Sequence, residues 1–586
     1  MTRVVRVRPD LPAVDREFDY SLPASLGDDV QVGTIVRVPL HGRRVRGWVT
    51  AVDVEPEAGE LRDVLKVSSA GPPADVIDLA AWTAHRYCGP LVHVLRAASP
   101  PNAVPPAPSS SVGAGLRPPG PPADGRLMLA WPPAADRKAV IAQHLAPSGS
   151  SIVITPAPGR TVPLVRSLRA AGRRVVLMHG SDAERSAAWR DASRGNCVVV
   201  GGRGAVFAPV PDLAALVVLD EHDEALQEER VPTWCAREVA AERARRSGAS
   251  LALITPVPTP EGVAIAGPVV RPDRAAERDG WPLVEVVDLR DGPPRGLLTE
   301  PFAAAVHHVL ESGGRVVCVV NRKGRAKLLA CAHCNELARC EACDAAVIDD
   351  GEQLVCPRCD TRRPRICRKC NSTKLKVLRA GVTKLLEELQ ALLPRATVAD
   401  IDAATDEVPD ADVYIGTEAA LHRVPPRAVK LVSFLDFDQE LLAPRVRATQ
   451  EALVLLARAG RVVGSRANNG RILVQTHVPD HPAIDAAFHA DPTSVLEGET
   501  ARLRVLGYPP FGGLAELSGS AAAVAVAAAA AGAAGAVVFG PIGDGERSRA
   551  LVSHRSSSLL ANVLAGVVPA AKAAGRVRVA VDPRRV

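Results

Sequence analysis

Eight cysteines within a forty-residue segment constrain this chain more than any other feature of its sequence. They form four Cys-x-x-Cys pairs: Cys331/Cys334, Cys340/Cys343, Cys356/Cys359 and Cys367/Cys370. One such pair directs two thiolates at one metal ion, and two pairs complete a tetrahedral four-cysteine site. The four pairs therefore predict two zinc ions within a cassette at residues 331–375.

Both zinc ions are expected to be structural. A catalytic zinc keeps one position open, whereas eight thiolates fill both sites here, so His333 is interpreted as a bystander. A disulfide framework is the alternative. It is disfavoured because the start of the chain, MTRVVRVRPDLP, lacks the apolar region of a signal peptide. The other cysteines lie in apolar surroundings, as reduced core thiols would: Cys88, Cys197, Cys235 and Cys318.

The sequence alone allows three pairings of the four Cys-x-x-Cys units. The spacing of Cys340/Cys343 and Cys356/Cys359, with twelve residues between them, is typical of a zinc ribbon. The outer units, Cys331/Cys334 and Cys367/Cys370, would then share the second ion in a nested arrangement.

Basic residues flank and fill the cassette: Arg322, Lys323, Arg325, Lys327, Arg358, Arg362, Arg363, Arg365, Arg368, Lys369, Lys374, Lys376 and Arg379. Such clustering beside a zinc ribbon favours contacts with nucleic-acid phosphates. A solvated surface in an arginine-rich chain is the alternative interpretation.

The length of 586 residues predicts several domains, and the net charge of +6 means that functional basicity must be local. The predicted boundaries are 1–104 for a β-rich N-terminal domain, 105–124 for a Pro/Ser/Gly-rich linker, 125–282 for a first α/β lobe, 283–330 and 376–478 for a second α/β lobe, 331–375 for the inserted cassette, and 479–586 for a small α+β C-terminal domain.

Short apolar runs between helical segments predict a doubly wound parallel sheet in each lobe. In the first lobe these runs are 127–130, 152–155, 174–178, 197–200, 216–220 and 251–255, and in the second they are 283–287, 316–320, 398–401, 413–416, 430–435 and 471–476. Two tandem lobes of this kind resemble the paired motor lobes of a nucleic-acid helicase at the level of fold.

One long uncharged run extends from Ala521 to Gly540. Its Ala and Gly residues supply too little hydrophobic driving force for a membrane span. We expect a packed helix followed by a strand at Ala536–Phe539, a further strand at Arg576–Val581, and a soluble, cytoplasmic protein with no membrane partner.

Several short motifs, in this order along the chain, accompany the cassette: Phe18-Asp-Tyr20, Gly33-Thr-Ile-Val-Arg-Val-Pro-Leu-His-Gly-Arg43, Asn321-Arg-Lys-Gly324, Gly416-Thr417, Val474-Gln-Thr-His477 and Tyr508-Pro-Pro-Phe511. In these motifs, and in a cassette inserted within the second lobe, the chain resembles the PriA family of primosomal replication-restart proteins over nearly its full length. The family's winged-helix domain would follow the N-terminal domain, where this chain has its linker, so we expect that domain to be missing.

The resemblance implies that the N-terminal domain binds the 3′ end of the nascent leading strand at a fork. The residues that match the family's motif are Phe18, Asp19 and Tyr20, together with a loop containing His41, Gly42, Arg43, Arg44 and Arg46. The alternative for Phe18 and Tyr20 is an ordinary core position. The resemblance further implies forked or branched DNA, primosome and helicase-loading proteins, and single-stranded-DNA-binding protein as partners, and a nucleoid-associated location.

The nucleotide site departs from the motor pattern. A motor of this type needs G-x-x-x-x-G-K-[ST] after its first strand, so that backbone N–H groups surround the phosphates. This chain has Trp131-Pro-Pro-Ala-Ala-Asp-Arg-Lys138 there, and two prolines remove two of the donors. ATP binding is therefore doubtful, and no catalytic residue is predicted.

Other motor motifs also differ from the family's pattern. Asp220 and Glu221 end a strand where a motor would hold Mg²⁺ and activate water, but His222 and Asp223 follow in swapped order. Arg458 and Arg461 are retained as arginine-finger candidates in a degenerate nucleotide site. The sequence thus favours a fork-binding scaffold without hydrolysis; an ATP-dependent 3′-to-5′ helicase and a zinc-ribbon nucleic-acid-binding protein outside replication are the alternatives.

Overall fold

The computed structural model describes residues 3–26, 30–56, 60–105, 125–290, 296–320, 329–334, 336–377, 382–402, 405, 407–426, 428–543 and 546–586. Most of the predicted linker, residues 106–124, and the motif at 321–324 lie outside these ranges, as do four of the predicted cassette-flanking cations, Arg322, Lys323, Arg325 and Lys327, and also Arg379. The predicted absence of a winged helix therefore stays a prediction.

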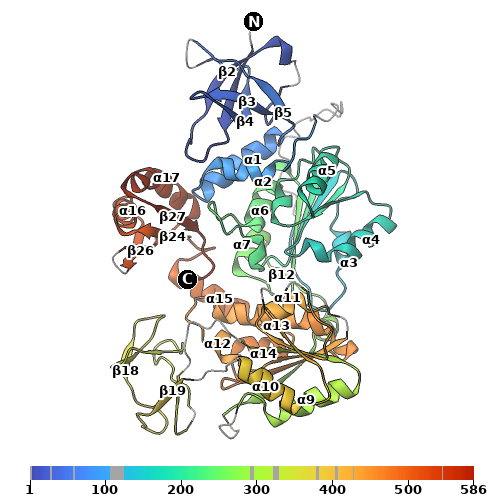
Figure 1. The fold of residues 1–586 in the computed structure, drawn as a ribbon, viewed down its shortest axis with the longest axis vertical. Coiled ribbons are helices and arrows are strands. Elements are labelled where there is room, and N and C mark those ends of the chain that lie inside the picture. Colours follow the sequence, from blue (N-terminus) through green and yellow to red (C-terminus); the bar gives the residue numbers. More distant parts are fainter. Residues whose placement is uncertain are drawn as a thin grey trace.

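The N-terminal domain is a five-stranded antiparallel sheet with strand order β2-β1-β4-β3-β5. Alternating residues such as Val5, Val7, Val36 and Val38 fill its core. Two helices follow the sheet and lie between it and the rest of the molecule (Figure 1). The elements are β1 (Arg3–Pro9), β2 (Phe18–Leu22), β3 (Ile35–Leu40), β4 (Arg43–Val52), β5 (Lys66–Ser69), α1 (Ala74–Arg86) and α2 (Leu91–Ala98).

Lobe 1 is a seven-stranded parallel sheet with strand order β12-β6-β11-β10-β7-β9-β8. Its strands are almost continuously apolar because helices cover both faces. The strands are β6 (Arg126–Ala130), β7 (Ser150–Ile154), β8 (Val175–Met178), β9 (Val198–Gly201), β10 (Leu213–Leu219), β11 (Ser250–Thr255) and β12 (Val269–Val270). The helices are α3 (Lys138–Gln143), α4 (Val162–Ala170), α5 (Asp182–Ala192), α6 (Ala236–Ser247), α7 (Pro260–Ala266) and α8 (Arg274–Asp279).

Lobe 2 is a six-stranded parallel sheet with strand order β13-β23-β22-β14-β21-β20, so the predicted doubly wound architecture of both lobes is confirmed. The strands are β13 (Leu283–Asp288), β14 (Arg315–Val319), β20 (Val398–Ile401), β21 (Val413–Gly416), β22 (Val429–Phe434) and β23 (Arg471–Thr476). The helices are α9 (Glu300–Glu311), α10 (Val382–Leu392), α11 (Ala419–Arg423), α12 (Asp438–Leu441), α13 (Ala448–Val463), α14 (Pro482–Phe488) and α15 (Thr493–Leu506). The last two fall within the predicted C-terminal domain of 479–586, but Ala483, Ile484 and Val495 pack in the core of lobe 2.

The cassette leaves lobe 2 after β14 and consists of two small antiparallel sheets. The outer sheet pairs β15 (Leu329–Cys331) with β19 (Leu375–Val377), which are the entry and the exit of the insertion. The inner sheet contains β16 (Ile348–Asp349), β17 (Gln353–Val355) and β18 (Arg362–Pro364).

The C-terminal domain is a four-stranded antiparallel sheet with strand order β25-β26-β24-β27, packed against two apolar helices. Its elements are β24 (Gly513–Ser520), α16 (Ala521–Ala533), β25 (Val537–Gly543), β26 (Arg547–His554), α17 (Ser557–Ala574) and β27 (Val577–Val581). Helix α17 has the length and composition of a membrane span, yet Leu560, Leu564 and Ala571 are buried within the domain.

Figure 1 shows the N-terminal domain above lobe 1 and lobe 2 below it, with the C-terminal domain beside lobe 1 and the cassette beside lobe 2. The side chain of Arg358 joins the cassette to lobe 2, because it donates to the carbonyl oxygens of Ala443 at 2.8 Å and Arg445 at 3.1 Å. The backbone N–H of Ala346 adds a bond to the Leu442 carbonyl at 3.2 Å.

Candidate functional sites

The cassette brings its eight cysteines into two clusters of four. Cys340, Cys343, Cys356 and Cys359 form one cluster, and within each cluster all four sulfur atoms lie within 4.8 Å of one another. Cys331, Cys334, Cys367 and Cys370 form the other. The two clusters confirm the nested pairing over the alternative pairings, and all eight thiols are free, as zinc sites require and a disulfide framework does not allow.

The geometry of each cluster fits one tetrahedral zinc ion. Sulfur atoms of opposite pairs, such as Cys331 and Cys370 or Cys343 and Cys356, lie 3.5 Å apart. A tetrahedral ion with Zn–S bonds of about 2.3 Å needs a separation close to this value. Backbone N–H groups of His333 and Ala342 point at the thiolates of Cys331 and Cys340 at 3.4 Å, as in metal-binding turns. The protein thus has two structural zinc sites.

The predicted DNA-binding residues on β2 occupy three different environments. Phe18 is half-buried, and the guanidinium of Arg16 lies 4.6 Å from the centre of its ring. The carboxylate of Asp19 accepts two bonds from Arg6 on β1, at 2.8 and 3.2 Å. Tyr20 is 3% exposed and its hydroxyl donates to the Pro39 carbonyl at 3.2 Å, so Tyr20 packs in the core and fixes β2 to β3.

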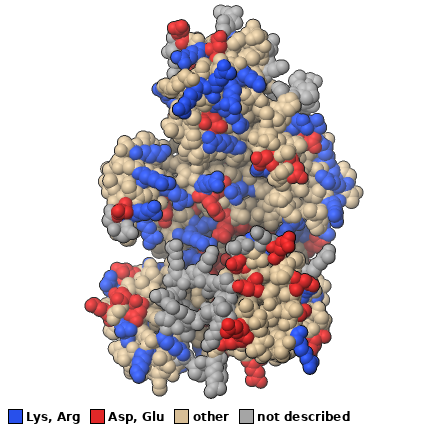
Figure 2. Space-filling model, in the orientation of Figure 1, with Lys and Arg blue, Asp and Glu red and all other residues tan. Residues whose placement is uncertain are grey.

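The predicted basic loop is the β3–β4 hairpin. His41 and Gly42 form its two-residue turn with φ values of 46° and 74°, the left-handed pair that a tight hairpin of this kind requires. Arg43 and Arg44 follow the turn and are exposed. Figure 2 shows Lys and Arg side chains gathered on the N-terminal domain at the top of the molecule.

One side of this hairpin carries a row of arginines. Arg44 and Arg46 lie on the same face of β4 because side chains alternate along a strand, and Arg37 on β3 pairs directly with Arg46. Burial lowers the pKa of Arg46, and the positive charges of Arg37 and Arg96 lower it further, against the opposing effect of Asp10. The predicted site did not include Arg37. Pro39 pairs with Arg44 across the hairpin, so Arg37, two residues before Pro39, lies on the same face and could have been inferred from strand alternation.

The predicted acidic pair lies at the carboxyl end of β10, and arginines hold both members. The Nη1 atom of Arg137 lies 3.0 Å from both oxygens of Asp220, and the Nη1 atom of Arg461 lies 2.6 Å from Oδ2. Burial alone would raise the pKa of Asp220, but these two guanidinium groups lower it well below its usual range. Asp220 is 2% exposed and has a left-handed backbone, with φ of 54°.

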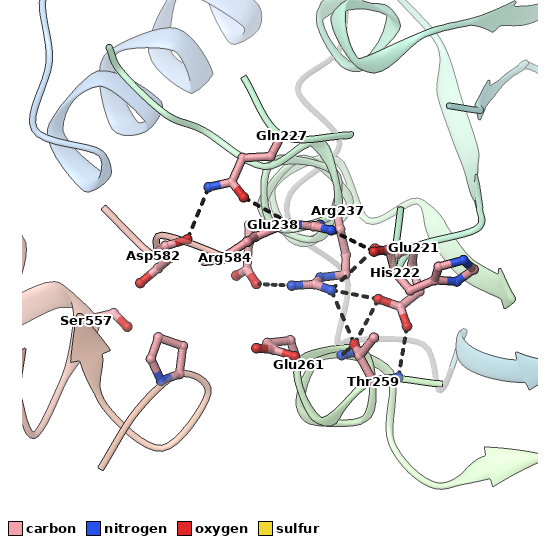
Figure 3. A network of polar contacts seen from close by, with 12 residues as sticks. Glu221, His222, Gln227, Arg237, Glu238, Thr259, Glu261, Ser557, Asp582 and Arg584 are labelled. Atoms are coloured by element: carbon pink, nitrogen blue, oxygen red, sulfur yellow. Dashed lines mark hydrogen bonds and ion pairs between the residues drawn. The ribbon is translucent and has the colours of Figure 1, made fainter. Parts of the chain in front are cut away.

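Glu221 is buried among three protein donors. Arg237 on α6 donates to its Oε2 atom at 2.6 Å, and the backbone N–H of Thr259 donates to Oε1 at 3.0 Å (Figure 3). The Thr259 hydroxyl adds a bond at 2.9 Å. Burial raises the pKa of Glu221, while Arg237 and Thr259 oppose that shift. Every oxygen of this carboxylate is thus engaged within lobe 1.

The segment after the acidic pair is held by the C-terminal domain. Arg584 donates to the His222 carbonyl at 2.6 Å and to the Gln227 side chain at 3.0 Å (Figure 3). The imidazole of His222 lies 2.6 Å from the Thr255 hydroxyl, and burial lowers the pKa of His222 to about 4. His222 and Asp223, the two residues in swapped order, therefore lie where lobe 1 meets the C-terminal domain.

The retained arginines also have partners. Arg458 lies 3.3 Å from a carboxylate oxygen of Asp223 and contacts Glu418, and Arg461 contacts Asp220. The sequence missed Arg137, Arg237 and Thr259 as partners of the acidic pair. No local pattern points to them, because only the folded lobe brings them to the end of β10.

Comparison with known proteins identifies both ends of the chain. Residues 6–100 match the family model described as the 3′ DNA-binding domain of PriA, and residues 504–584 match the model of the primosomal protein N C-terminal domain.

Longer matches to known proteins include the parts between. The chain is 30% identical over 567 residues to the probable replication restart protein PriA of Mycobacterium bovis, which covers 88% of this chain and 86% of the relative. It is 27% identical over 399 residues to the replication restart protein PriA of Bacillus subtilis. That match spans 63% of this chain and only half of the relative. This chain belongs to the PriA family of replication restart proteins.

Proposed function

We propose that this protein binds abandoned or branched replication forks through its 3′ DNA-binding domain and promotes reloading of the replicative helicase without hydrolysing ATP. The absence of ATP hydrolysis is inferred from the contacts of Asp220 and Glu221. Each is a buried carboxylate whose oxygens are occupied by arginine or Thr259 donors, whereas a motor needs them for Mg²⁺ and water.

The fork-binding half rests on the N-terminal domain. The exposed hairpin with Arg37, Arg44 and Arg46 offers positive charge to a phosphate backbone, which supplies most of the affinity of such complexes. Phe18, Asp19 and the turn His41–Gly42 lie on the same small sheet and are proposed to select a free 3′ end. Asp19 would act through its bonds with Arg6, because its side chain is only 5% exposed. Tyr20 would act by positioning β2, because it is buried.

The partners and the place of action follow from the same proposal. We infer that primosome proteins, helicase-loading proteins and single-stranded-DNA-binding protein assemble on this protein at the fork, on the chromosome in the cytoplasm. The two zinc sites support this role by giving the cassette a fixed shape, and its exposed cations Arg362, Arg368 and Lys369 are available for phosphate contacts.

The test measures fork binding and ATP hydrolysis on the same preparation. Binding to a fork with a free 3′ leading-strand end should be tighter than to one whose 3′ end is blocked, and Asp19→Ala should reduce this preference. Asp53→Ala is the matched control, because it removes an exposed Arg–Asp pair that also involves β1. ATP turnover should stay at background with and without the fork.

The alternative is an ATP-dependent helicase with an atypical nucleotide site, favoured by the retention of Asp220, Glu221, Arg458 and Arg461 in two helicase-like lobes. Fork-stimulated turnover that disappears in Glu221→Gln, under conditions in which the variant is still folded and binds forks, would establish that alternative. Equal losses on free and blocked ends in Asp19→Ala would refute the assignment of the 3′-end site.

A further inference from the structure

The loop that replaces the phosphate-binding motif packs between the two lobes. On the lobe 1 side, Pro132 lies so close to Gly280 that an added Cβ there would meet the proline ring at 2.4 Å. Pro133 contacts α13 of lobe 2 at Gly460, where an added Cβ would lie 3.2 Å from the proline and 3.1 Å from Pro282. The loop therefore fits against α13 at backbone distance.

Charged groups complete this contact. Asp220 of lobe 1 lies between Arg137, from its own lobe, and Arg461, from α13 of lobe 2. The carboxylate is 2% exposed, so its charge is compensated by protein groups alone. Two cations from opposite lobes on one buried carboxylate form a direct connection between them.

Further pairs flank this one along α13. Arg458 contacts Asp223 of lobe 1 and Glu418 of lobe 2, and both Arg458 and Asp223 are largely buried. Arg447, at the start of α13, contacts the buried Glu261 on α7 of lobe 1. Three cations, Arg137, Arg458 and Arg461, thus face three carboxylates, Asp220, Asp223 and Glu418, so this part of the interface is balanced in charge.

We infer that these residues make the former nucleotide site a permanent interface, so that lobes 1 and 2 form one closed unit without nucleotide or metal. In a motor, the metal and the phosphates bring the lobes together, and their loss lets the cleft open. Here Arg137 takes the place of that cation on Asp220, and Pro132 and Pro133 fill the space of the phosphates. This inference rests on contacts between the lobes and is independent of whether the protein binds forks.

Hydrogen–deuterium exchange of the full chain, read together with small-angle scattering, tests the closed unit. Peptides covering 131–137 and 448–463 should be protected in the wild-type protein. Addition of ATP, ADP or a non-hydrolysable ATP analogue with Mg²⁺ should leave both the exchange and the radius of gyration unchanged. Arg461→Ala should raise exchange at both peptides at least tenfold and enlarge the radius of gyration.

The matched control is Arg471→Ala, which removes an arginine–carboxylate pair with Glu285 at 2.8 Å that lies wholly within lobe 2. It should leave the interface peptides protected. The double variant Asp220→Asn/Arg461→Ala should open the interface by less than the sum of its single variants, because the two residues share one interaction.

Two results would overturn the inference. One is rapid exchange of the interface peptides in the wild-type protein, or a change in them on adding nucleotide. The other is equal opening by Arg461→Ala and Arg471→Ala. Loss of protection in β14 and β22 would show that Arg461→Ala unfolds the chain. In that case, the effect of nucleotide on exchange in the wild-type protein still tests the inference. Failure of fork binding would leave these results unchanged, so it bears on the proposed function alone.

Discussion

Arg237 donates to the Oε2 atom of Glu221 at 2.6 Å, and the two side chains are only 8% and 0% exposed. The pair joins α6 to the end of β10, and Thr259 at the start of α7 binds the same carboxylate. A residue that would activate water in a motor therefore connects three elements of lobe 1. Glu221 therefore contributes to the stability of lobe 1.

Glu221→Gln should lower the stability of lobe 1 by roughly 1–3 kcal/mol, because the buried Arg237 loses its closest counter-charge and keeps Glu238, at 3.4 Å. Fork affinity should not change. Denaturant unfolding monitored by exchange of lobe 1 peptides measures the first effect, and fluorescence anisotropy with a labelled fork measures the second. Glu242→Gln on α6, the helix that carries Arg237, is the control. Its partners Arg245 and Arg246 lie at the surface, so each of these ion pairs contributes less than about 1 kcal/mol. Equal effects of the two substitutions would contradict this account.

Zinc content should follow the nested pairing. The purified protein should contain two zinc ions per chain, and Cys340→Ser and Cys331→Ser should each lose one ion, because they belong to different clusters. Elemental analysis of the purified variants measures this. Cys88→Ser, which changes a half-buried thiol outside the cassette, should keep both ions. A single ion in the unmodified protein would be incompatible with the two clusters.

Removal of one arginine from the hairpin should weaken DNA binding through charge alone. Arg44→Ala should reduce affinity for free and blocked forks alike and lower the slope of log affinity against log salt by about 1. Titrations at several salt concentrations give the slope. Arg245→Ala, an exposed arginine on α6 paired with Glu242, removes the same charge elsewhere. An unchanged slope in Arg44→Ala would place the phosphate contacts on another surface.

Acid should destabilise the protein in part through His222. Burial lowers the pKa of His222 from its ordinary value to about 4. Between about pH 6.5 and pH 4, the imidazole is therefore protonated in the unfolded chain but neutral in the folded chain. Stability therefore falls as pH decreases from about 6.5 to 4, by up to roughly 3 kcal/mol for this residue, and is flat above that window. Burial likewise lowers the pKa of His481 to about 4, so His481 contributes in the same direction.

Melting temperatures measured between pH 7 and pH 4.5 test this contribution. His222→Gln should show a smaller loss on acidification than the wild-type protein, although its melting temperature at pH 7 is lower because the contact with Thr255 changes. His489→Gln, at an exposed position on the surface of lobe 2, should follow the wild-type curve. Parallel curves for His222→Gln and the wild-type protein would exclude His222 as a source of the acid sensitivity.

The features that the sequence predicted are those with local signatures. The spacing of Cys340 and Cys343 from Cys356 and Cys359 specifies a metal-binding turn pair without reference to the rest of the fold, and the apolar runs of both lobes mark buried parallel strands. Strands β24 and β26 were missed, because Gly513–Ser520 and Arg547–His554 contain polar and glycine positions that interrupt their alternation. Their hydrogen bonding to each other along eight residues, with β27 pairing with β24, compensates for weak propensity.

The environment of the acidic pair was beyond prediction for a different reason. Asp220 is held by Arg461, 241 residues further along the chain, and by Arg137, 83 residues before it. Nothing in the residues around an arginine specifies which distant carboxylate it will meet. The sequence predicted a missing phosphate cradle, and the fold adds the two arginines that lie on Asp220.

The packing of Pro132 against Gly280 and of Pro133 against Gly460 has a consequence for the history of this lineage. Each contact involves a glycine that accepts the proline at backbone distance; the first fixes the loop within lobe 1, and the second fits it to α13 of lobe 2. Replacing either proline with glycine would leave a gap, and Asp220 would still be bound by two arginines. On the closed interface inferred above, a nucleotide site needs changes at the prolines and at the arginines together, and each change alone removes a contact of that interface. The inferred interface would thus act as an evolutionary ratchet against a return to ATP dependence in this lineage.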